Sequence, residues 1–532
     1  MKNVNKILII VASLTGVQSV YGQSAFDCYS LSQSDLRGTA RFTAMAGAFG
    51  ALGGDLSVLN QNPGGIGIYR SSDIGVTLNW NVQNVKAGEG YDQFKTKETR
   101  FNFNNVGYVG VYNTDNDVCP NFNWGFSYNR KADLNRHYYG EISNIPTSMT
   151  NYVAGQANID GYTTGELGAV RGEYDPYYDS NAPWMSILAY NSYLINPLSE
   201  NTYQGLMDSR SSGYSQFEVD ERGQIDEYTI SFGGNVYNTL YWGASVGIID
   251  YDYSAYTYYG ENIQNAMVPY DDRGDGIAPG EADWGIENNL NIYGTGVNFK
   301  IGLIAKPINE LRLGLAFHTP TFYSLTSEYG AGTSYYLAAN GHAQIDGDAE
   351  TNSGYWGYTD FEMRSPWKVI ASAAGVIGGR AIVSFDFEHT AYPSMRVSYD
   401  GREDRQLSNC INQYYKGSET VRLGAEFKVT PQFSVRAGYS YQTSPFSDDI
   451  MNDKLDVQTA GTTLSYVLDD NIQHVTAGVG YRYKKFYADL AYVYKQREGK
   501  FVAFSPDANS LSPTAPVKDT NSEVTLSVGF RF

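Results

Sequence analysis

Residues 522–532 read SEVTLSVGFRF and end on an aromatic side chain. Apolar and polar residues alternate along this stretch without a break. One face carries Val524, Leu526, Val528, Phe530 and Phe532, and the other carries Thr525, Ser527, Gly529 and Arg531. A period of two residues is typical of a β-strand whose two faces meet different surroundings. The stretch therefore predicts an amphipathic strand.

The same alternation recurs upstream of this strand. From Ile74 onward it predicts fourteen strands in all, several of them about ten residues long. Short connections such as Asn238-Thr239 and Lys484-Lys485 alternate with long ones, the longest being about residues 133–225. Residues 259–290 and 327–357 are also expected to be loops. The pattern predicts an all-β chain with short turns at one end and long loops at the other.

Composition indicates export and a β-rich fold. The chain has 532 residues, including 46 tyrosines and 56 glycines, and only 18% are charged, which is typical of aromatic-rich β proteins. Residues 1–22 contain Lys2, Lys6 and an apolar run and end in Val20-Tyr21-Gly22, which predicts a signal peptide and a mature chain that begins at Gln23. The net charge of −19 argues against nucleic acid as a partner, because phosphate would be repelled.

Alternation alone also fits a soluble sandwich or propeller. Strand length, the loop asymmetry and the terminal Phe532 favour a 14-stranded antiparallel transmembrane β-barrel in a bacterial outer membrane. Its outer face would contact outer-membrane lipid. Phe532, at the tip of an alternating strand, is expected to be read by the outer-membrane insertion machinery.

A second stretch precedes the first strand. Residues 38–68 read GTARFTAMAGAFGALGGDLSVLNQNPGGIGI, which is rich in glycine and small residues. Fourteen strands enclose more space than wall side chains fill. We therefore predict that residues 23–72 form a hatch that plugs the lumen of a barrel made by residues 73–532. A glycine-rich linker is the alternative, but Phe42 and Phe49 are too apolar for a solvated linker.

The end of this stretch, Asn62-Pro63-Gly64-Gly65, resembles the Asn-Pro-Ala signature in the N-terminal hatch of the FadL/TodX family of outer-membrane channels for hydrophobic compounds. Gly64 stands where the family has alanine. The segments that also match are Ala305-Lys306-Pro307, Ser365-Pro366-Trp367 and Arg436-Ala437-Gly438-Tyr439. The resemblance covers the mature chain, although the 133–225 insertion is longer than expected for the family.

The resemblance implies passive uptake of a lipophilic small molecule, typically a long-chain fatty acid or aromatic hydrocarbon. The molecule would enter an apolar pocket, controlled by a hatch with Asn62, Pro63, Gly64 and Gly65 as gating residues, and leave sideways through the wall near strand three. Gly125 in that strand is a candidate kink, since glycine weakens a strand locally. Relief of crowding in the lumen is the alternative role. A monomer without a cofactor is expected.

Residues 183–195, PWMSILAYNSYLI, predict an amphipathic helix in the longest loop. Trp184, Ile187 and Leu188 lie near one face and could capture ligand from the surface. Packing of the loop against the barrel mouth is the alternative role.

No catalytic motif and no metal-ligand spacing emerges. Residues 271–276 faintly resemble a calcium loop, but their spacing is not that of an EF-hand. Cys28 and Cys119 are the one pair that the topology places on one side. The competing functions are a non-transport barrel that acts as a surface-anchoring or secretion-associated scaffold and, disfavoured by the missing motifs, an outer-membrane enzyme.

Overall fold

The computed structural model describes residues 23–88, 94–168, 172, 174–271, 276–506 and 511–532. The expected signal peptide, residues 1–22, lies outside the described residues, as does most of the acidic loop at 271–276.

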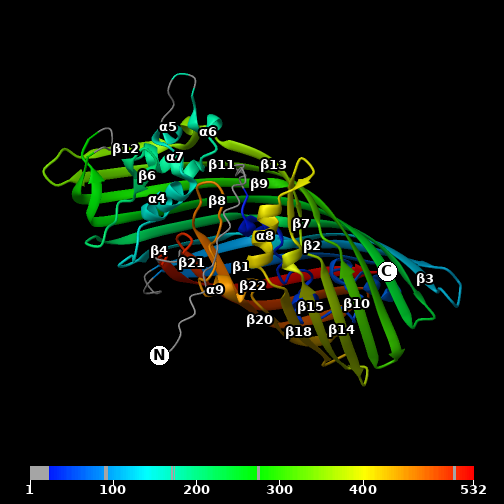
Figure 1. Cartoon of the computed structure of the whole chain (residues 1–532). Coiled ribbons are helices and arrows are strands. Elements are labelled where there is room, and N and C mark those ends of the chain that lie inside the picture. Colours follow the sequence, from blue (N-terminus) through cyan, green and yellow to red (C-terminus); the bar gives the residue numbers. More distant parts are fainter. Residues whose placement is uncertain (1–22, 89–93, 169–171, 173, 272–275, 507–510) are drawn as a thin grey trace, which may run out of the picture.

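The chain forms one closed antiparallel β-barrel (Figure 1), which confirms the predicted fold class. β1 pairs with β22 from Asp73↔Arg531 to Ala87↔Val517, so the first and last strands close the sheet. Two of the fourteen strands are each interrupted into two pieces. In order around the barrel the strands are β1 (Asp73–Ala87), β2 (Lys95–Asn113), β3 (Asn121–Asp133), β7 (Ser212–Val236), β8 (Leu240–Pro269), β9 (Ile277–Ile308), β10 with β11 (Leu311–His318, Phe322–Ala339), β14 with β13 (Lys368–Ile377, Gly357–Arg364), β15 (Ala381–Thr390), β18 (Ser418–Lys428), β19 (Phe433–Gln442), β20 (Tyr466–Tyr483), β21 (Phe486–Val502) and β22 (Thr514–Arg531).

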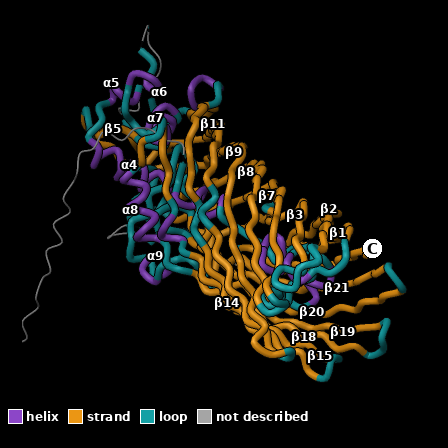
Figure 2. The backbone as a smooth tube through the Cα atoms, turned by 90° about the vertical axis from the view of Figure 1, so that its right-hand side faces the viewer, coloured by secondary structure: helices purple, strands orange, loops and turns teal. Residues whose placement is uncertain are grey.

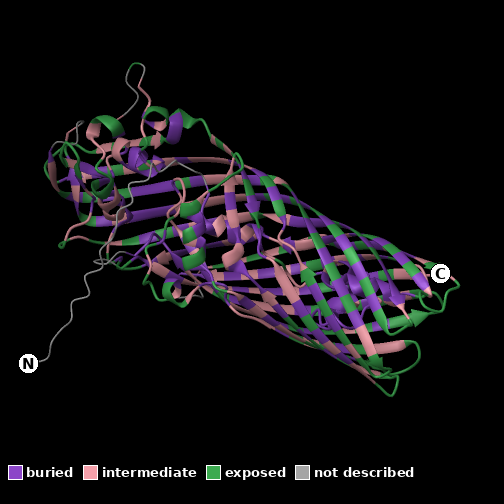
Figure 3. Cartoon of the chain, turned by 45° about the vertical axis from the view of Figure 1, so that its right-hand side comes forward, coloured by how far each residue is buried: buried purple, intermediate pink, exposed green. Residues whose placement is uncertain are grey.

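Near the short turns, the outward side chains are apolar and exposed, and the inward ones are small or polar and buried. Figure 3 shows this alternation of exposed and buried residues along the strands. On β8, Trp242 and Ile248 are 38% and 48% exposed, whereas Ser245 between them is 3% exposed. A belt of exposed apolar side chains is stable only against lipid, and closure leaves no unpaired sheet edge in the hydrocarbon. The architecture is that of a bacterial outer-membrane barrel.

The two ends of the barrel differ, as Figure 2 shows. Short turns join the strands at one end, and the helices of the long loops gather at the other. The longest connection contains β4 (Arg136–Ile142), α4 (Met149–Asp160), α5 (Thr164–Leu167), α6 (Pro176–Asp179), α7 (Trp184–Asn191), β5 (Asn196–Ser199) and β6 (Thr202–Gln204). Later loops contain β12 (Ile345–Glu350), η2 (Thr351–Gly354), η3 (Tyr392–Ser394), β16 (Arg396–Tyr399), β17 (Arg402–Glu403), α8 (Arg405–Tyr414) and α9 (Asp448–Met451).

Three predicted loop boundaries are wrong. β7 begins at Ser212, inside the predicted 133–225 loop, β8 and β9 fill most of 259–290, and β11 and β12 fill much of 327–357. The cause is visible on β8, where apolar and polar residues exchange faces partway along the strand. Ile248 is exposed, but past it Asp250 is exposed while Tyr251 is buried. The strand continues beyond the lipid, where water meets its outer face, so the pattern that marks a lipid-facing strand ends before the strand does.

Residues 23–72 form α1 (Ala25–Leu31), α2 (Ala40–Ala44), α3 (Val58–Gln61) and η1 (Pro63–Ile68), drawn in blue within the barrel in Figure 1. Phe42, Phe49 and Leu52 are buried and pack with Ala374 of the wall. Ion pairs add to this packing, since Arg41 Nε lies 2.9 Å from Glu426 Oε2. The segment therefore occupies the lumen through apolar and charged contacts together.

No helix in the described part of the chain is long and apolar enough to cross a membrane. Cys28 is buried and Cys119 exposed, and both are free thiols, so the disulfide considered from the sequence is not formed.

Candidate functional site

Four cavities follow one another along the N-terminal segment. The mouth cavity, of about 320 Å³, and the aromatic cavity, of about 150 Å³, share Ser24 in their linings. A narrow link of about 30 Å³ shares Ser30 with the aromatic cavity and Arg37 with a charged chamber of about 130 Å³. Together they make a succession of spaces from the long-loop end toward the middle of the lumen.

The mouth cavity lies between the long loops and the start of α1. Trp184 on α7 and Leu407 on α8 contribute to its lining. Ile187 and Leu188 are fully buried in the core of the longest loop and do not reach the cavity. α7 exists as predicted, but of the three proposed capture residues only Trp184 meets the path, and the helix serves mainly to pack the loop.

The aromatic cavity lies between α1 and the wall. Phe26 of α1 stacks on Tyr466 with 4.8 Å between ring centroids. Tyr138, Tyr253 and Phe501 add further rings to the lining, which also includes the charged residues Asp27, Arg136, Glu221 and Asp469. Aromatic rings offer large apolar contact areas, so this cavity fits the apolar part of a ligand.

The α1 helix is fixed by a capping box. The backbone N–H of Ser24 donates to Asp27 Oδ2 (2.6 Å), and the N–H of Asp27 donates to Ser24 Oγ (3.3 Å). Burial raises the pKa of Asp27 to about 6, although its hydrogen bonds to Ser24 oppose the shift. The docking of α1 is therefore sensitive to pH.

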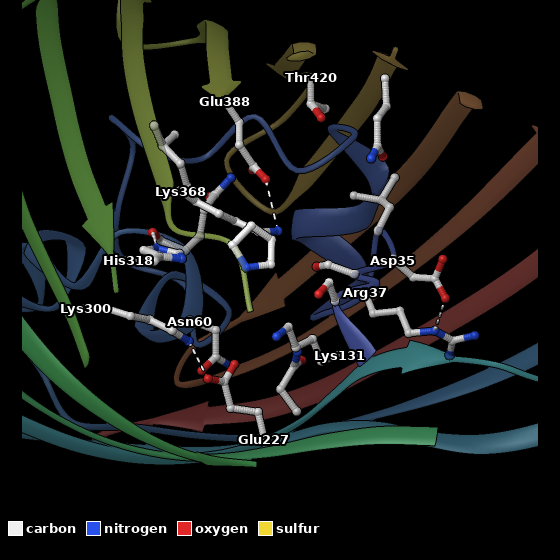
Figure 4. A pocket seen from close by; sticks show the side chains of 18 of the residues that line it. Asp35, Arg37, Asn60, Lys131, Glu227, Lys300, His318, Lys368, Glu388 and Thr420 are labelled. Atoms are coloured by element: carbon white, nitrogen blue, oxygen red, sulfur yellow. Dashed lines mark hydrogen bonds and ion pairs between the residues drawn. The ribbon is translucent and has the colours of Figure 1, made fainter. Parts of the chain in front are cut away.

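The charged chamber is shown in Figure 4. Lys300 Nζ lies 2.6 Å from Glu227 Oε1, and Glu388 is shared by Lys368 at 3.3 Å and Arg422 at 2.7 Å. The chamber differs from the apolar pocket that the resemblance implies. On the strand wall its cations are Lys131, Lys300, Lys368 and Arg422, and its carboxylates are Glu227 and Glu388.

Lys131 is the chamber cation without a counterion. Its side chain lines the chamber and has no hydrogen-bond or ion-pair partner among the residues that the structure describes. The pairing of β3 with β7 shifts between Arg130 and Ala132, so Lys131 is the extra residue of a β-bulge. Bulges re-aim a side chain, and this one directs an amine into the chamber.

A second irregularity lies on the neighbouring strand. The pairing of β1 with β2 skips Asn104, whose Nδ2 donates to the carbonyl of Gly38 in the hatch at 2.7 Å. The ladder between β2 and β3 ends at Asn105↔Asn129, although both strands continue. Beyond that point side chains join them, as where Asn102 Nδ2 donates to Asp133 Oδ2 at 3.1 Å. We call this stretch, residues 95–104 of β2 and 130–133 of β3, the β2/β3 seam.

Gly125 is not at the irregular part of strand three. It pairs with Val109 on one side and Ser231 on the other without a shift in register. A Cβ at this position would lie 3.3 Å from Cδ1 of Ile66 in the hatch. The kink expected at Gly125 is thus not seen there, and the irregularity lies between Arg130 and Ala132 instead.

The predicted gating residues form a knot at the short-turn end. Asn62 Nδ2 donates to the carbonyls of Gly50 (2.6 Å) and Leu303 (3.3 Å), and Asn62 Oδ1 accepts from the N–H of Gly64 (3.0 Å). Pro63 begins η1. A Cβ on Gly64 would come within 2.9 Å of the backbone of Gly302 on the wall, and one on Gly65 would meet Val58 at 2.8 Å. Asn62 ties the hatch to itself and to the wall, and both glycines permit close packing.

One wall residue holds the hatch from the opposite side. Asp386 on β15 is fully buried, and its Oδ2 accepts from the backbone N–H groups of Phe49 (3.0 Å) and Gly50 (2.9 Å) and from Gln61 Nε2 (3.1 Å). A carboxylate that accepts several N–H bonds is a strong anchor.

Sequence reasoning missed Lys131, Lys300 and Asp386. A signal was present, because Lys300 stands between Phe299 and Ile301, and Asp386 between Phe385 and Phe387, each at an inward position of an otherwise lipid-facing strand. At the bulge, the only signal in the sequence was the pair of consecutive charged residues Arg130 and Lys131. Which of these charges meet across the lumen depends on barrel closure.

Among the described residues, no group of three or more His, Cys, Asp or Glu side chains is placed to hold a metal ion.

No protein-family model and no curated protein matches the sequence. The fold is similar to the crystal structure of a Pseudomonas aeruginosa FadL homologue, with a TM-score of 0.54 and 13% identity, over 96% of this chain and 100% of that one. The toluene transporter TodX of P. putida aligns over 94% of this chain and 99% of its own, with 14% identity and a TM-score of 0.46. The CymD monoaromatic hydrocarbon channel aligns over the same shares, with 10% identity and a TM-score of 0.43.

Proposed function

We propose that this chain is a passive outer-membrane channel for lipophilic small molecules with an anionic head group, of which long-chain fatty acids are the simplest class. It acts as a monomeric channel and not as an enzyme. The solved structure with the similar fold is described as a FadL homologue, which supports hydrophobic uptake. The carrying observation is Lys131, an amine that forms no direct ion pair with any described residue and that lines a chamber at the end of the cavity path.

The chamber selects the head group. Its other cations are already paired with Glu227 and Glu388. A carboxylate beside Lys131 would supply the missing counterion, and a charge-assisted hydrogen bond is about twice as strong as a neutral one. A plain hydrocarbon would instead have to displace water from these charges without replacing its hydrogen bonds, which is unfavourable. The chamber therefore favours a fatty acid over an aromatic hydrocarbon.

The upper cavities would take the apolar part of the same molecule. Ligand enters at the mouth cavity, beside Trp184, and its chain contacts the rings of the aromatic cavity. The hatch below the chamber, with Asn62, Pro63, Gly64 and Gly65, blocks direct passage to the short-turn end. Lateral exit passes through the β2/β3 seam, where no backbone ladder closes the wall and Lys131 stands at its edge.

The test compares a fatty acid with its uncharged analogue. Purified protein in mild detergent is titrated with palmitate and with hexadecanol. Lys131→Met is expected to weaken palmitate binding about 10- to 100-fold, which is the loss of about 1.5–3 kcal/mol for a hydrogen bond between charged groups. Hexadecanol binding should change little, and Lys131→Arg should restore most of the palmitate affinity.

Lys428→Met is the matched control, since Lys428 ends β18 at the short-turn end and is exposed. If the native protein binds neither probe, and nothing lipophilic co-purifies with it, the channel is refuted and a non-transport scaffold becomes the better explanation. Equal losses of palmitate and hexadecanol in Lys131→Met would refute the head-group role.

A further inference from the structure

Two neighbouring wall strands are interrupted at one level, and each interruption contains a proline. β10 and β11 are separated by Thr319-Pro320-Thr321, and β14 and β13 by Ser365-Pro366-Trp367. The pairs His318↔Lys368 and Phe322↔Arg364 enclose the two breaks, so they lie opposite each other. The next strand, β15, ends at Thr390 and is followed by the turn that contains Pro393.

These breaks thin the backbone ladder between the two interrupted strands. Each strand is still bonded to its other neighbour, from the N–H of Thr319 to the carbonyl of Phe299 (2.9 Å) and from the N–H of Ala391 to the carbonyl of Trp367 (3.1 Å). Proline has no N–H to donate, so Pro320 and Pro366 each remove a ladder bond. Hydroxyl groups replace part of the ladder, since the N–H of Thr321 donates to Ser365 Oγ (2.8 Å) and the N–H of Phe299 donates to Thr319 Oγ1 (3.0 Å). One backbone bond remains between the two strands at this level, from the N–H of Ser365 to the carbonyl of Thr321 (3.0 Å).

The interruption separates the charged chamber from the outer surface. Thr319, Thr321, Ser365 and Pro366 line the chamber from inside. On the outside, Phe317 and Phe322 flank the break and are 38% and 54% exposed, so it lies within the apolar outer face. A backbone that faces lipid must satisfy its polar groups internally. Where side-chain hydroxyls satisfy the backbone in place of a neighbouring strand, fewer backbone hydrogen bonds must break for the wall to open.

The hatch contacts the edge of the break directly. His318, immediately before it, donates from Nε2 to the carbonyl of Gln61 at 2.7 Å. Gln61 precedes Asn62 and also bonds to Asp386. Movement of this part of the hatch would release His318, so the state of the hatch is coupled to the wall at this point.

We propose that Thr319–Thr321 and Ser365–Trp367 form a second lateral portal, distinct from the β2/β3 seam and released by the hatch through His318. The apolar chain passes through it first, from the chamber into the surrounding lipid, and the anionic head leaves the chamber cations last. The portal depends on the proposed transport of lipophilic molecules, and its test is separable from that function.

The test locks the portal with a disulfide. Thr321 and Ser365 are directly opposite in antiparallel strands, where Cα atoms lie about 4.5–5.5 Å apart, within the range that a disulfide spans. Thr321→Cys with Ser365→Cys is made in a background that carries Cys119→Ser and Cys410→Ser. The control is Val383→Cys with Ala425→Cys, an outward-facing pair in the uninterrupted ladder of β15 and β18.

Uptake of labelled palmitate is measured in Gram-negative host cells that lack their own fatty-acid channel. Oxidation of the portal pair is expected to lower uptake at least about twofold, because the cross-link removes the open conformer of the portal and leaves only the β2/β3 seam as a lateral route. A reducing agent should restore it, and the control pair should transport normally in both states. The reduced variant also serves as the folding control, checked by its heat-dependent mobility on a detergent gel.

Palmitate binding in detergent is measured in parallel and should be unaffected by the cross-link. Normal uptake by the fully oxidised portal pair would overturn the proposal and leave the β2/β3 seam as the lateral route. Loss of binding together with uptake would also overturn it, because the cross-link would then act on the chamber. Failure of the native protein to bind palmitate would refute the proposed function itself.

Discussion

Asp386→Ala is expected to release the middle of the hatch while leaving the barrel intact. The substitution removes the acceptor of three hydrogen bonds and leaves the N–H groups of Phe49 and Gly50 buried without a partner. Each hydrogen bond to a charged group contributes about 1.5–3 kcal/mol. Gln61 Nε2 keeps its bond to the carbonyl of Gly47, and water can enter the space, so we take about 4 kcal/mol as the net loss.

A loss of about 4 kcal/mol raises the population of the locally open hatch about a thousandfold. Amide hydrogen exchange followed by mass spectrometry measures this directly on peptides that cover residues 45–60. Peptides from the barrel strands should keep their protection, and heat-dependent mobility should remain. Ser384→Ala is the matched control, because Ser384 is a fully buried inward residue of the same strand whose hydroxyl has no hydrogen-bond partner among the described residues. A change of less than about tenfold in the exchange of residues 45–60 would refute the anchor.

Other predictions concern α1, the knot and assembly. Because the pKa of Asp27 rises from 3.8 to about 6 on docking, α1 binds most firmly below about pH 4 and loses up to about 3 kcal/mol as the pH rises from about 4 to 6, above which no further loss occurs. Acrylamide quenching of a Phe26→Trp variant should therefore increase between pH 4.5 and 7.5, and Asp27→Asn should abolish this pH dependence. Asn62→Ala should lower palmitate uptake while the barrel still assembles, whereas a scaffold would show normal function. Deletion of Phe532 should reduce the heat-modifiable fraction in the outer membrane without changing palmitate binding by the molecules that do assemble.

The barrel could be predicted from the sequence because lipid imposes one strict requirement on its outer face. Trp242 and Ile248 face lipid and are apolar, whereas Ser245 between them faces the lumen and is polar. The period of two is therefore preserved wherever the wall meets lipid. Past Ile248 that requirement ends. Tyr251 and Tyr253 turn inward to the core at the mouth, and the strand continues with the opposite phase, which a search for apolar-out alternation does not detect.

The path through the lumen could be predicted only in part. The knot at Asn62 has a local sequence pattern, and its glycines are required by close packing against the wall. The chamber has no such pattern, because Lys131, Lys300 and Glu388 come from strands far apart in the chain and meet only after the barrel closes. The β2/β3 seam likewise depends on two bulges, whose positions follow from pairing and not from composition.

The phase reversal on β8 has a consequence for where a ligand is first met. β9 has 32 residues. At about 3.3 Å per residue and a tilt near 40°, only about ten residues are needed to cross the apolar belt, so the rest would raise the rim by roughly 50 Å above the bilayer. The rim formed by β9 then stands in the medium outside the bilayer rather than at the lipid head groups. On the proposed function, a lipophilic molecule would meet this raised rim before it meets the lipid surface.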